Sequence, residues 1–333
     1  MTRWLFLRTA HRGAALTLPP PGQLTTCTDM WTHLFDAIMS QSGGSGEIWR
    51  LASSESRVQL SGRTVERRSA NLAGAAEFRP HVIMDRGGYG AYRPVLDSCP
   101  DALKIYYGAG QRFCPPAGRH YDLVLVDTPL QARIVSQACQ HSFVDLFIKP
   151  AAENLFAPVP VETVFDLVFV AHTPKPFKGH EWLIERVPSW ARILRIGTPD
   201  PWFTRVKEEG LLDVEFTGLL RPEDIPAQAC RARAGVVCDD GLHDSAPRVL
   251  PELLAMDIPV LMRDSVRYDR ARYITPETGR LVGPHSHFGA ELLSLLDAQV
   301  HPRSYYLTDL SMAESARRIV RVVEELCAQR SNT

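Results

Sequence analysis

Three apolar segments in succession, each leading directly into glycine or polar residues, constrain the fold of this chain most strongly. They lie at residues 82–84, 105–107 and 123–126. Short apolar runs of this kind, bounded by turn residues, are typical of strands buried on both faces of a parallel sheet. Loops at the carboxyl ends of such strands form the ligand-binding edge of an α/β domain. The sequence therefore predicts an α/β fold with a ligand site at this edge.

The remaining segments of the first half fit the same plan. A short apolar run at residues 4–7 predicts the first strand, and residues 8–26 form a loop rich in proline and glycine. Helices are predicted at 30–40 and 130–139, with strands at 48–51 and 146–148. The glycine run at 42–46 follows a helix and precedes a strand, which is the reverse of a phosphate-binding loop.

The chain of 333 residues is too long for one typical core and suits two domains of about 150 residues. We predict a first domain over residues 1–150 and a second over 151–310, joined by a proline-rich segment at 149–160. Strands of the second domain are predicted at 167–171, 193–196, 214–219, 235–238 and 258–262. An amphipathic helix at 312–327 lies in a C-terminal segment, 311–333, that crosses back to the first domain in the fold proposed below.

Charge is distributed unevenly along the chain. The net charge is -1, which argues against a dedicated nucleic-acid-binding protein. Residues 1–150 nevertheless contain 16 Lys+Arg against 12 Asp+Glu, and residues 151–333 contain 21 against 26. Many arginines of the first half lie between Arg50 and Arg68. They suit an anionic acceptor or, as the simpler alternative, a solvated surface.

Cysteine usage and hydropathy indicate the compartment. The 7 cysteines are scattered without a C-x-x-C pair, as expected for reduced thiols in a cytoplasmic protein. The apolar run at 4–7 is too short for a signal peptide, and no run approaches the length of a membrane span. The oligomeric state is not indicated by the sequence.

The stretch from Asp244 to Met262 is the most suggestive for chemistry. Asp244 precedes a short apolar helix, and Glu252 lies on that helix two turns further on. A helix start presents unpaired N–H groups and a positive dipole end, which suit a phosphate. Carboxylates nearby suit sugar hydroxyls better than a phosphate. An ordinary amphipathic helix with an acidic first turn is the alternative.

This stretch resembles the donor-site motif of family 4 of the glycosyltransferases, which are retaining enzymes of GT-B fold. In that motif an acid, a small residue, an apolar residue and proline are followed by a second acid. Pro247 stands five residues before Glu252 as the pattern requires, and Asp244 occupies a position where the family usually has Glu. The shorter side chain bears on the identity of the donor sugar.

Three further segments extend the resemblance over most of residues 120–285. The proline-rich segment matches the linker of the family at Pro150, Glu153, Phe156 and Pro158. Lys178 and Gly179 match a Lys-Gly pair that contacts the donor diphosphate. The arginine that accompanies this pair in the family is missing, and His172 or Lys175 is a candidate replacement. Residues 278–283 resemble the final Gly-x-Leu-Val segment.

The resemblance implies the GT-B fold, with two Rossmann-like parallel-sheet domains facing each other across a cleft. It implies a hexosyltransferase that moves a sugar from a UDP- or GDP-linked donor to an acceptor with retention of configuration. No cofactor and no metal is implied, since the nucleotide sugar itself is the donor. A metal site at Asp239, Asp240, His243 and Asp244 is the alternative there, but these residues lack a spacing that a defined metal requires.

The candidate site residues follow from the resemblance and from the polar loop ends. Catalytic candidates are Lys178, Asp244 and Asp85. Donor-binding candidates are His172, Lys175, Lys178, Gly179, Asp244, Ser245, Ala246, Pro247 and Glu252. Acceptor-binding candidates are Arg86 and Arg112, although each is an ordinary loop residue in the simpler interpretation.

The acceptor class stays open. A glycan, a lipid-linked intermediate, a small molecule and a nucleic acid all fit a basic first domain. An alternative function is a catalytically silent GT-B scaffold that binds a nucleotide sugar or a partner protein. An NAD-dependent enzyme is disfavoured because no G-x-G-x-x-G follows the first strand.

Overall fold

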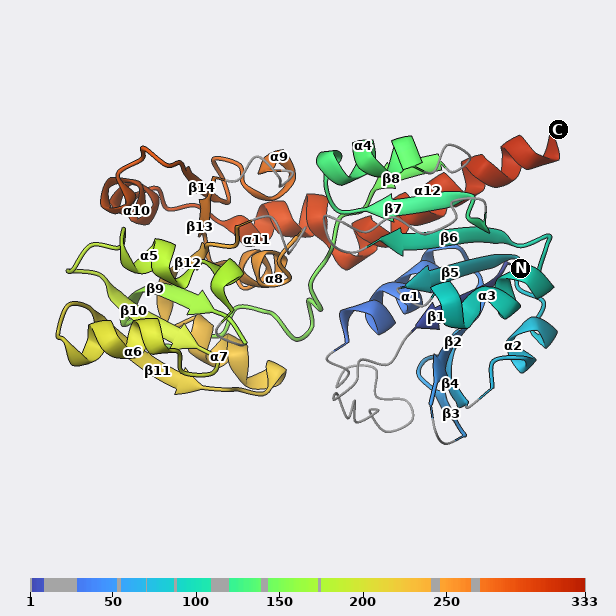
Figure 1. Cartoon of the computed structure of the whole chain (residues 1–333), viewed down its shortest axis with the longest axis horizontal. Helices are drawn as coiled ribbons and strands as arrows, with labels where there is room; N and C mark the ends of the chain where they lie inside the picture. Colours follow the sequence, from blue (N-terminus) through green and yellow to red (C-terminus); the bar gives the residue numbers. More distant parts are fainter. Residues whose placement is uncertain are drawn as a thin grey trace. The chain divides into compact units, whose positions relative to one another are not determined.

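The chain forms two compact units. The computed structural model describes residues 2–8, 29–52, 55–69, 71–86, 89–108, 120–138, 143–172, 175–240, 246–264 and 270–332. One unit comprises Met1–Ile148 together with Met312–Thr333, and the other comprises Lys149–Ser311. Each unit is built around its own sheet, with helices packed against it (Figure 1). Among the described residues, no helix is both long and apolar enough to span a membrane.

The sheet of the first unit has eight strands. They are β1 (Arg3–Arg8), β2 (Ser45–Leu51), β3 (Ser56–Gln59), β4 (Thr64–Ser69), β5 (Val82–Arg86), β6 (Leu103–Gly108), β7 (Leu123–Val126) and β8 (Phe143–Leu146). Their order is β3-β4-β2-β1-β5-β6-β7-β8, and all pairs are parallel except β3 with β4. The chain moves outward from β1 through β2 and then returns to β5 on the other side of β1. The β1–β5 pair is therefore the topological switch point of this sheet.

Alternating side chains of the first sheet face two helical layers. The helices of this unit are α1 (Met30–Gln41), α2 (Gly74–Glu77), α3 (Tyr89–Ser98), α4 (Pro129–Ala138) and α12 (Met312–Ser331). Phe6 and Met84 pack in one buried cluster with residues of α1 and α12, whereas Leu7 and Ile83 pack with residues of α3 and α4. Because neighbouring residues of a strand point to opposite faces, an apolar run with no polar interruption is needed to fill both layers.

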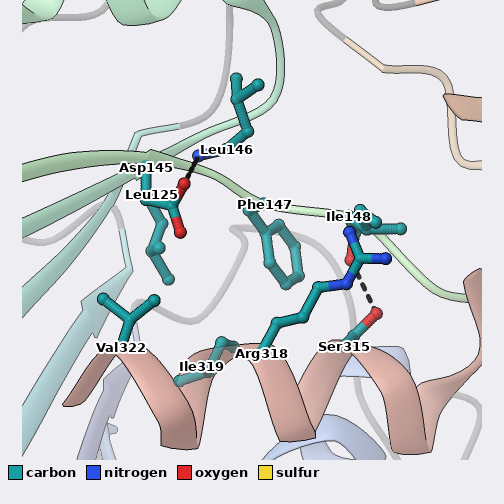
Figure 2. A pocket seen from close by; sticks show the side chains of 9 residues that line it. All are labelled: Leu125, Asp145, Leu146, Phe147, Ile148, Ser315, Arg318, Ile319 and Val322. Carbon is teal, nitrogen blue, oxygen red and sulfur yellow. Dashed lines mark hydrogen bonds between the residues drawn. The ribbon is translucent and has the colours of Figure 1, made fainter. Parts of the chain in front are cut away.

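The C-terminal helix α12 belongs to the core of the first unit. Ser315 on α12 donates a hydrogen bond to the carbonyl oxygen of Ile148 at 2.9 Å (Figure 2). Next to this bond, a cavity of about 10 Å³ is lined by Leu125, Phe147 and Arg318 among others. That volume admits at most one water molecule. This contact region is thus a packed helix–sheet interface and not a candidate ligand site.

The second unit has a six-stranded, fully parallel sheet. Its strands are β9 (Phe165–Val170), β10 (Arg192–Ile196), β11 (Asp213–Gly218), β12 (Ala232–Val237), β13 (Val260–Arg263) and β14 (Gly279–Val282). The order is β11-β10-β9-β12-β13-β14. The chain again reverses direction beside its first strand, so the switch point lies between β9 and β12.

Short helices connect these strands or follow the last of them. They are η3 (Pro176–Lys178), α5 (His180–Ile184), α6 (Pro201–Glu208), η4 (Pro222–Asp224), α7 (Ile225–Ala229), α8 (Val249–Ala255), α9 (Arg270–Tyr273), α10 (Phe288–Asp297), α11 (Pro302–Tyr305) and η5 (Tyr306–Leu310). Leu183, Phe203 and Leu292 of α5, α6 and α10 share one buried cluster with the sheet. Helix α8 packs against β12, where a Cβ on Gly235 would approach Leu253 Cδ1 to 2.6 Å.

The predicted α/β fold with two mostly parallel sheets is confirmed, one local prediction is wrong, and one hairpin was not predicted. The strand predicted at 146–148 is β8, Phe143–Leu146; Phe147 and Ile148 are buried against the sheet and α12 without extending the strand. The hairpin of β3 and β4 carries few apolar residues and gave no strand signal. Its strands are held by pairing at the sheet edge, which the local pattern does not encode.

Candidate functional site

The carboxyl ends of β9 and β12 place two loops in direct contact. Gly179 has φ +75°, and a Cβ there would come within 2.2 Å of the carbonyl oxygen of Cys238, directly after β12. The backbone N–H of Asp240 donates to the carbonyl of Phe177 at 3.0 Å. Only glycine combines this left-handed conformation with so close an approach. The Lys178–Gly179 pair is therefore fixed at the switch point of the second sheet.

Lys178 is held by a carboxylate from the facing loop. Its Nζ lies 2.5 Å from Oδ1 of Asp239, which is 3% exposed at the end of β12. The ammonium groups of Lys175 and Lys178 both lie against the ring of Phe177, at 5.6 Å and 5.3 Å from its centroid. The predicted cations Lys175 and Lys178 thus share one platform, with Lys175 the more exposed of the two.

His172 lies at the other side of the β9 loop. Its carbonyl oxygen accepts hydrogen bonds from the backbone N–H and the hydroxyl of Thr198, at 3.3 Å and 2.9 Å. These bonds hold the ends of β9 and β10 together. The side chain of His172 is exposed, and no contact within the described part of the chain ties it to Lys178.

A buried network of hydrogen-bonded charged side chains lies next to the loop that contains Lys178. Asp200 accepts from Arg195 Nε at 3.1 Å, lies 3.1 Å from Nδ1 of His180, and caps α6 by accepting from the backbone N–H of Phe203. All three charged or titratable side chains are at most 1% exposed. Burial opposes ionisation of Asp200, but the hydrogen bonds and the nearby cations hold the pKa of its carboxyl below the ordinary value. Because His180 follows Gly179 directly, this network positions the loop.

The motif around Ala246 and Glu252 lies beside a buried lysine. Lys149 Nζ donates to the carbonyl oxygen of Ala246 at 2.7 Å. Glu252 is half-buried on α8. Burial raises the pKa of its carboxyl to about 7, although the positive charges of Arg248 and Lys149 act in the opposite direction. A carboxyl group with this pKa changes its charge near neutral pH.

The switch point of the first unit carries the predicted residues Asp85 and Arg86. Asp85 is fully buried and accepts a hydrogen bond from the Tyr121 hydroxyl at 2.6 Å. The Arg86 guanidinium lies 4.5 Å from the ring centroid of Trp31. Both residues end β5, next to Leu7 and Arg8 of β1.

Several arginines of this half are paired with carboxylates. Arg50, at the end of β2, lies 2.9 Å from Glu66 and 3.3 Å from Asp29, and Arg8 also contacts Asp29. Arg67 contacts Glu47 at 2.8 Å. The alternative of a solvated arginine surface is therefore wrong for Arg50, which is 4% exposed.

The structure thus gathers the predicted residues into two groups and adds others. Lys175, Lys178 and Gly179 form one group, and Ala246, Pro247 and Glu252 form another. Asp244, Ser245 and Arg112 lie outside the described residues, and their roles stay predictions. Sequence patterns missed Lys149, His180, Arg195, Asp200 and the role of Asp239 as the partner of Lys178. Only the Asp200-Pro201 pair carried a local signal, that of a helix N-cap.

Comparisons with known proteins establish the fold. No family of known proteins matches the sequence, and no curated protein matches it. Solved structures do match. A sucrose-phosphate synthase from Thermosynechococcus elongatus has a TM-score of 0.70 at 13% identity, covering 99% of this chain and 100% of that one. A glycosyltransferase involved in avilamycin A biosynthesis has a TM-score of 0.66 at 16% identity, covering 99% of each chain.

A third structure is the pneumococcal O-GlcNAc transferase GtfA solved with UDP and GlcNAc. It has a TM-score of 0.55 at 12% identity and covers 74% of this chain and 57% of that one. At these identities the likeness concerns the fold, which is the two-domain α/β architecture that these transferases share. The predicted GT-B class is confirmed to that extent.

Proposed function

We propose that this protein is a retaining glycosyltransferase that moves a hexose from a UDP- or GDP-linked donor to an acceptor. The observation that carries the proposal is the fixed Lys178–Gly179 loop at the switch point of the second sheet, where α/β domains bind nucleotides. Matches to glycosyltransferases over nearly the whole chain support it. UDP bound to the pneumococcal transferase favours a nucleotide diphosphate donor.

Lys178 acts on the leaving diphosphate. Negative charge grows on this group as the sugar–phosphate bond breaks, and a fixed ammonium stabilises that charge without reorganisation. Asp239, 2.5 Å from Lys178 Nζ, fixes the ammonium before substrate arrives. Lys175, on the same Phe177 platform, supplies a second and weaker positive charge, with His172 as the other candidate.

Glu252 binds the ribose, and Asp244 binds hydroxyls of the sugar. An ionised carboxylate accepts hydrogen bonds from two ribose hydroxyls with both of its oxygens, whereas protonation turns one of these oxygens into a donor. Since the pKa of Glu252 is about 7, donor binding is coupled to loss of a proton from this side chain. The backbone of Ser245, Ala246 and Pro247 approaches the phosphates and the sugar.

The acceptor binds to the first unit, where Asp85, Arg86 and Arg112 are the candidate residues. Asp85 is the candidate base there, and its bond to Tyr121 fixes the carboxylate at the end of β5. A glycan, a lipid-linked intermediate, a small molecule and a nucleic acid remain the acceptor classes to test.

The experiment that tests the proposal measures donor binding and turnover. Thermal shifts with UDP, GDP, ADP and TDP identify the nucleotide, and the corresponding nucleotide sugars are then assayed for release of free nucleotide. Glu252→Gln and Lys178→Ala should abolish or strongly weaken both signals, whereas Glu208→Gln, on the exposed face of α6, should not. NMR of the released sugar reports whether the anomeric configuration is retained. If no nucleotide changes the melting temperature, the proposed donor site is contradicted.

A catalytically silent scaffold is the second candidate. Asp244 in place of the usual Glu and the missing arginine of the family's Gly-Arg pair favour it, because both reduce the groups that act on the donor. A scaffold would bind the nucleotide sugar and lose this binding in Glu252→Gln. It would release no nucleotide with any sugar donor or acceptor.

A further inference from the structure

Lys149, the first residue of the second unit, occupies an unusual position for a lysine. It is 7% exposed, and its Nζ donates a 2.7 Å hydrogen bond to the carbonyl oxygen of Ala246, a residue 97 positions further along the chain. A buried ammonium loses its hydration and is retained only where hydrogen bonds or charges compensate. The environment of Lys149 is therefore built for this side chain.

The backbone of Lys149 is fixed as well. Its N–H donates to the hydroxyl of Tyr273 at 2.9 Å, and the same hydroxyl lies 3.3 Å from the Lys149 carbonyl oxygen, to which it donates. Tyr273 is 5% exposed. The backbone and the side chain of Lys149 are thus both held by hydrogen bonds, so the ammonium contacts the Ala246 carbonyl in a defined geometry.

The charge of Lys149 acts on Glu252. Two cations lower the pKa of this carboxyl: Arg248, directly before α8, and Lys149, which reaches it from the segment between β8 and β9. Arg248 is exposed, and its charge is screened by water, whereas Lys149 is buried. Arg303 of α11 bonds the Ala255 carbonyl at the opposite end of α8. Of the two cations that act on Glu252, Lys149 is accordingly the buried one.

We propose that Lys149 is a positioning residue of the donor site: its ammonium fixes the carbonyl of Ala246, three residues before α8, and supplies a buried positive charge that favours the ionised form of Glu252. The role in donor binding rests on the proposed function, whereas the effect on Glu252 can be measured without any ligand. The two parts can therefore fail separately.

The first experiment titrates Glu252 in the ligand-free protein. NMR of ¹³C-labelled glutamate carboxyl groups follows the titration, and Glu252→Gln identifies the signal. In Lys149→Met the midpoint should rise by about one pH unit, because a buried charge beside the carboxyl is lost. Lys149→Arg should stay close to the wild type. Lys207→Met, which removes an exposed charge from α6, should leave the midpoint unchanged.

The second experiment measures binding of the nucleotide sugar that the thermal shifts select. Lys149→Met should weaken binding roughly sixfold more at pH 6.5 than at pH 8.5, as expected for a one-unit rise of a carboxyl pKa from about 7. Tyr273→Phe should show a smaller change of the same sign, and Lys149→Arg should restore most of the affinity. Circular dichroism confirms that each variant is folded.

The outcomes separate the proposals. An unchanged Glu252 midpoint in folded Lys149→Met overturns the electrostatic part, and an equal loss of affinity at both pH values overturns the coupling to donor binding. A wild-type protein that binds no nucleotide sugar overturns the proposed function and the donor-site role of Lys149 with it. The titration then still decides whether Lys149 controls Glu252.

Discussion

The two units differ in the environment of the charged residues that lie near their parallel sheets. In the first unit, the arginine Arg50 is enclosed with Glu66 and Asp29, and each of these side chains is nearly inaccessible. In the second unit, Lys178 is 22% exposed and Glu252 is half-buried. Two sheets of the same type thus carry two kinds of charged group. In the first unit a buried arginine is neutralised by its carboxylate partners, and in the second unit the charged side chains are partly exposed and can contact a ligand. Removing charge should affect stability in the first unit and binding in the second.

Arg50→Met should have the largest effect on stability. Removal of one partner from a buried ion pair leaves uncompensated carboxylates and costs about 3–5 kcal/mol. Urea denaturation measures the loss. Arg57→Met is the matched control: Arg57 is exposed on β3, and no ion pair of this residue is found in the described part of the chain, so a change within about 0.5 kcal/mol is expected. If both variants are equally stable, the cluster around Arg50 is not structural.

Gly179→Ala should come next. Its new Cβ would meet the Cys238 carbonyl in a left-handed backbone conformation, so the loop must move. We expect a loss of about 2–4 kcal/mol and no measurable nucleotide binding. Gly210→Ala separates the two causes, because Gly210 has φ +68° but no atom lies within 4 Å of the point that its Cβ would occupy. That variant should lose only about 1–2 kcal/mol; equal losses would show that the close approach at Gly179 is unimportant.

The pH dependence of donor affinity should be intermediate in size. With a pKa of about 7, Glu252 is mostly protonated at pH 6 and mostly ionised at pH 8. Affinity for the nucleotide sugar should therefore rise about tenfold over this range. Calorimetry with wild type and Glu252→Gln tests this, since the variant has no carboxyl to titrate. A flat wild-type profile would contradict the role given to Glu252.

The same carboxyl makes stability depend on pH. Its folded-state pKa of about 7 lies above the ordinary 4.5, so the folded protein holds about one proton that the unfolded chain releases. This contribution is fully present below pH 4.5 and is lost as the pH rises through about 7. Melting temperatures of the wild type relative to Glu252→Gln should fall across this window. If the difference in melting temperature between the two proteins does not change with pH, Glu252 lies in a more solvated environment.

Lys175→Ala should have the smallest effect. Its ammonium is exposed, and exposed charges are screened, so a two- to threefold loss of nucleotide affinity is expected. Lys178→Ala, measured beside it, should lose at least tenfold, because Asp239 holds that ammonium in place. If the two variants are equivalent, the fixed geometry of Lys178 contributes nothing.

Much of the fold could be predicted from local patterns. Apolar runs followed by glycine or polar loops located β5, β6 and β7 and the strands of the second sheet, because a buried parallel strand must be apolar on both faces. The helix predicted at 312–327 lies within α12, Met312–Ser331. The β3–β4 hairpin was not predicted because its side chains are mostly polar and because β4 is held in the sheet by pairing with the more distant β2.

The candidate site, like the fold, could be predicted only in part from local sequence. The positions of Lys178 and Glu252 followed from motifs whose residues are close in sequence. Their partners did not: Asp239 lies 61 residues from Lys178, and Lys149 lies 97 residues from Ala246. No local pattern carries such pairings.

Local sequence is sufficient to predict the alternation of strands and helices, the polar loop ends and the residue types available for chemistry, since these depend on neighbours along the chain. Which charges neutralise one another and which keep access to a ligand depends on the folded arrangement. The reason is physical: ionisation and reach depend on burial and on distances of a few ångströms, and these are set by segments brought together only when the sheets form.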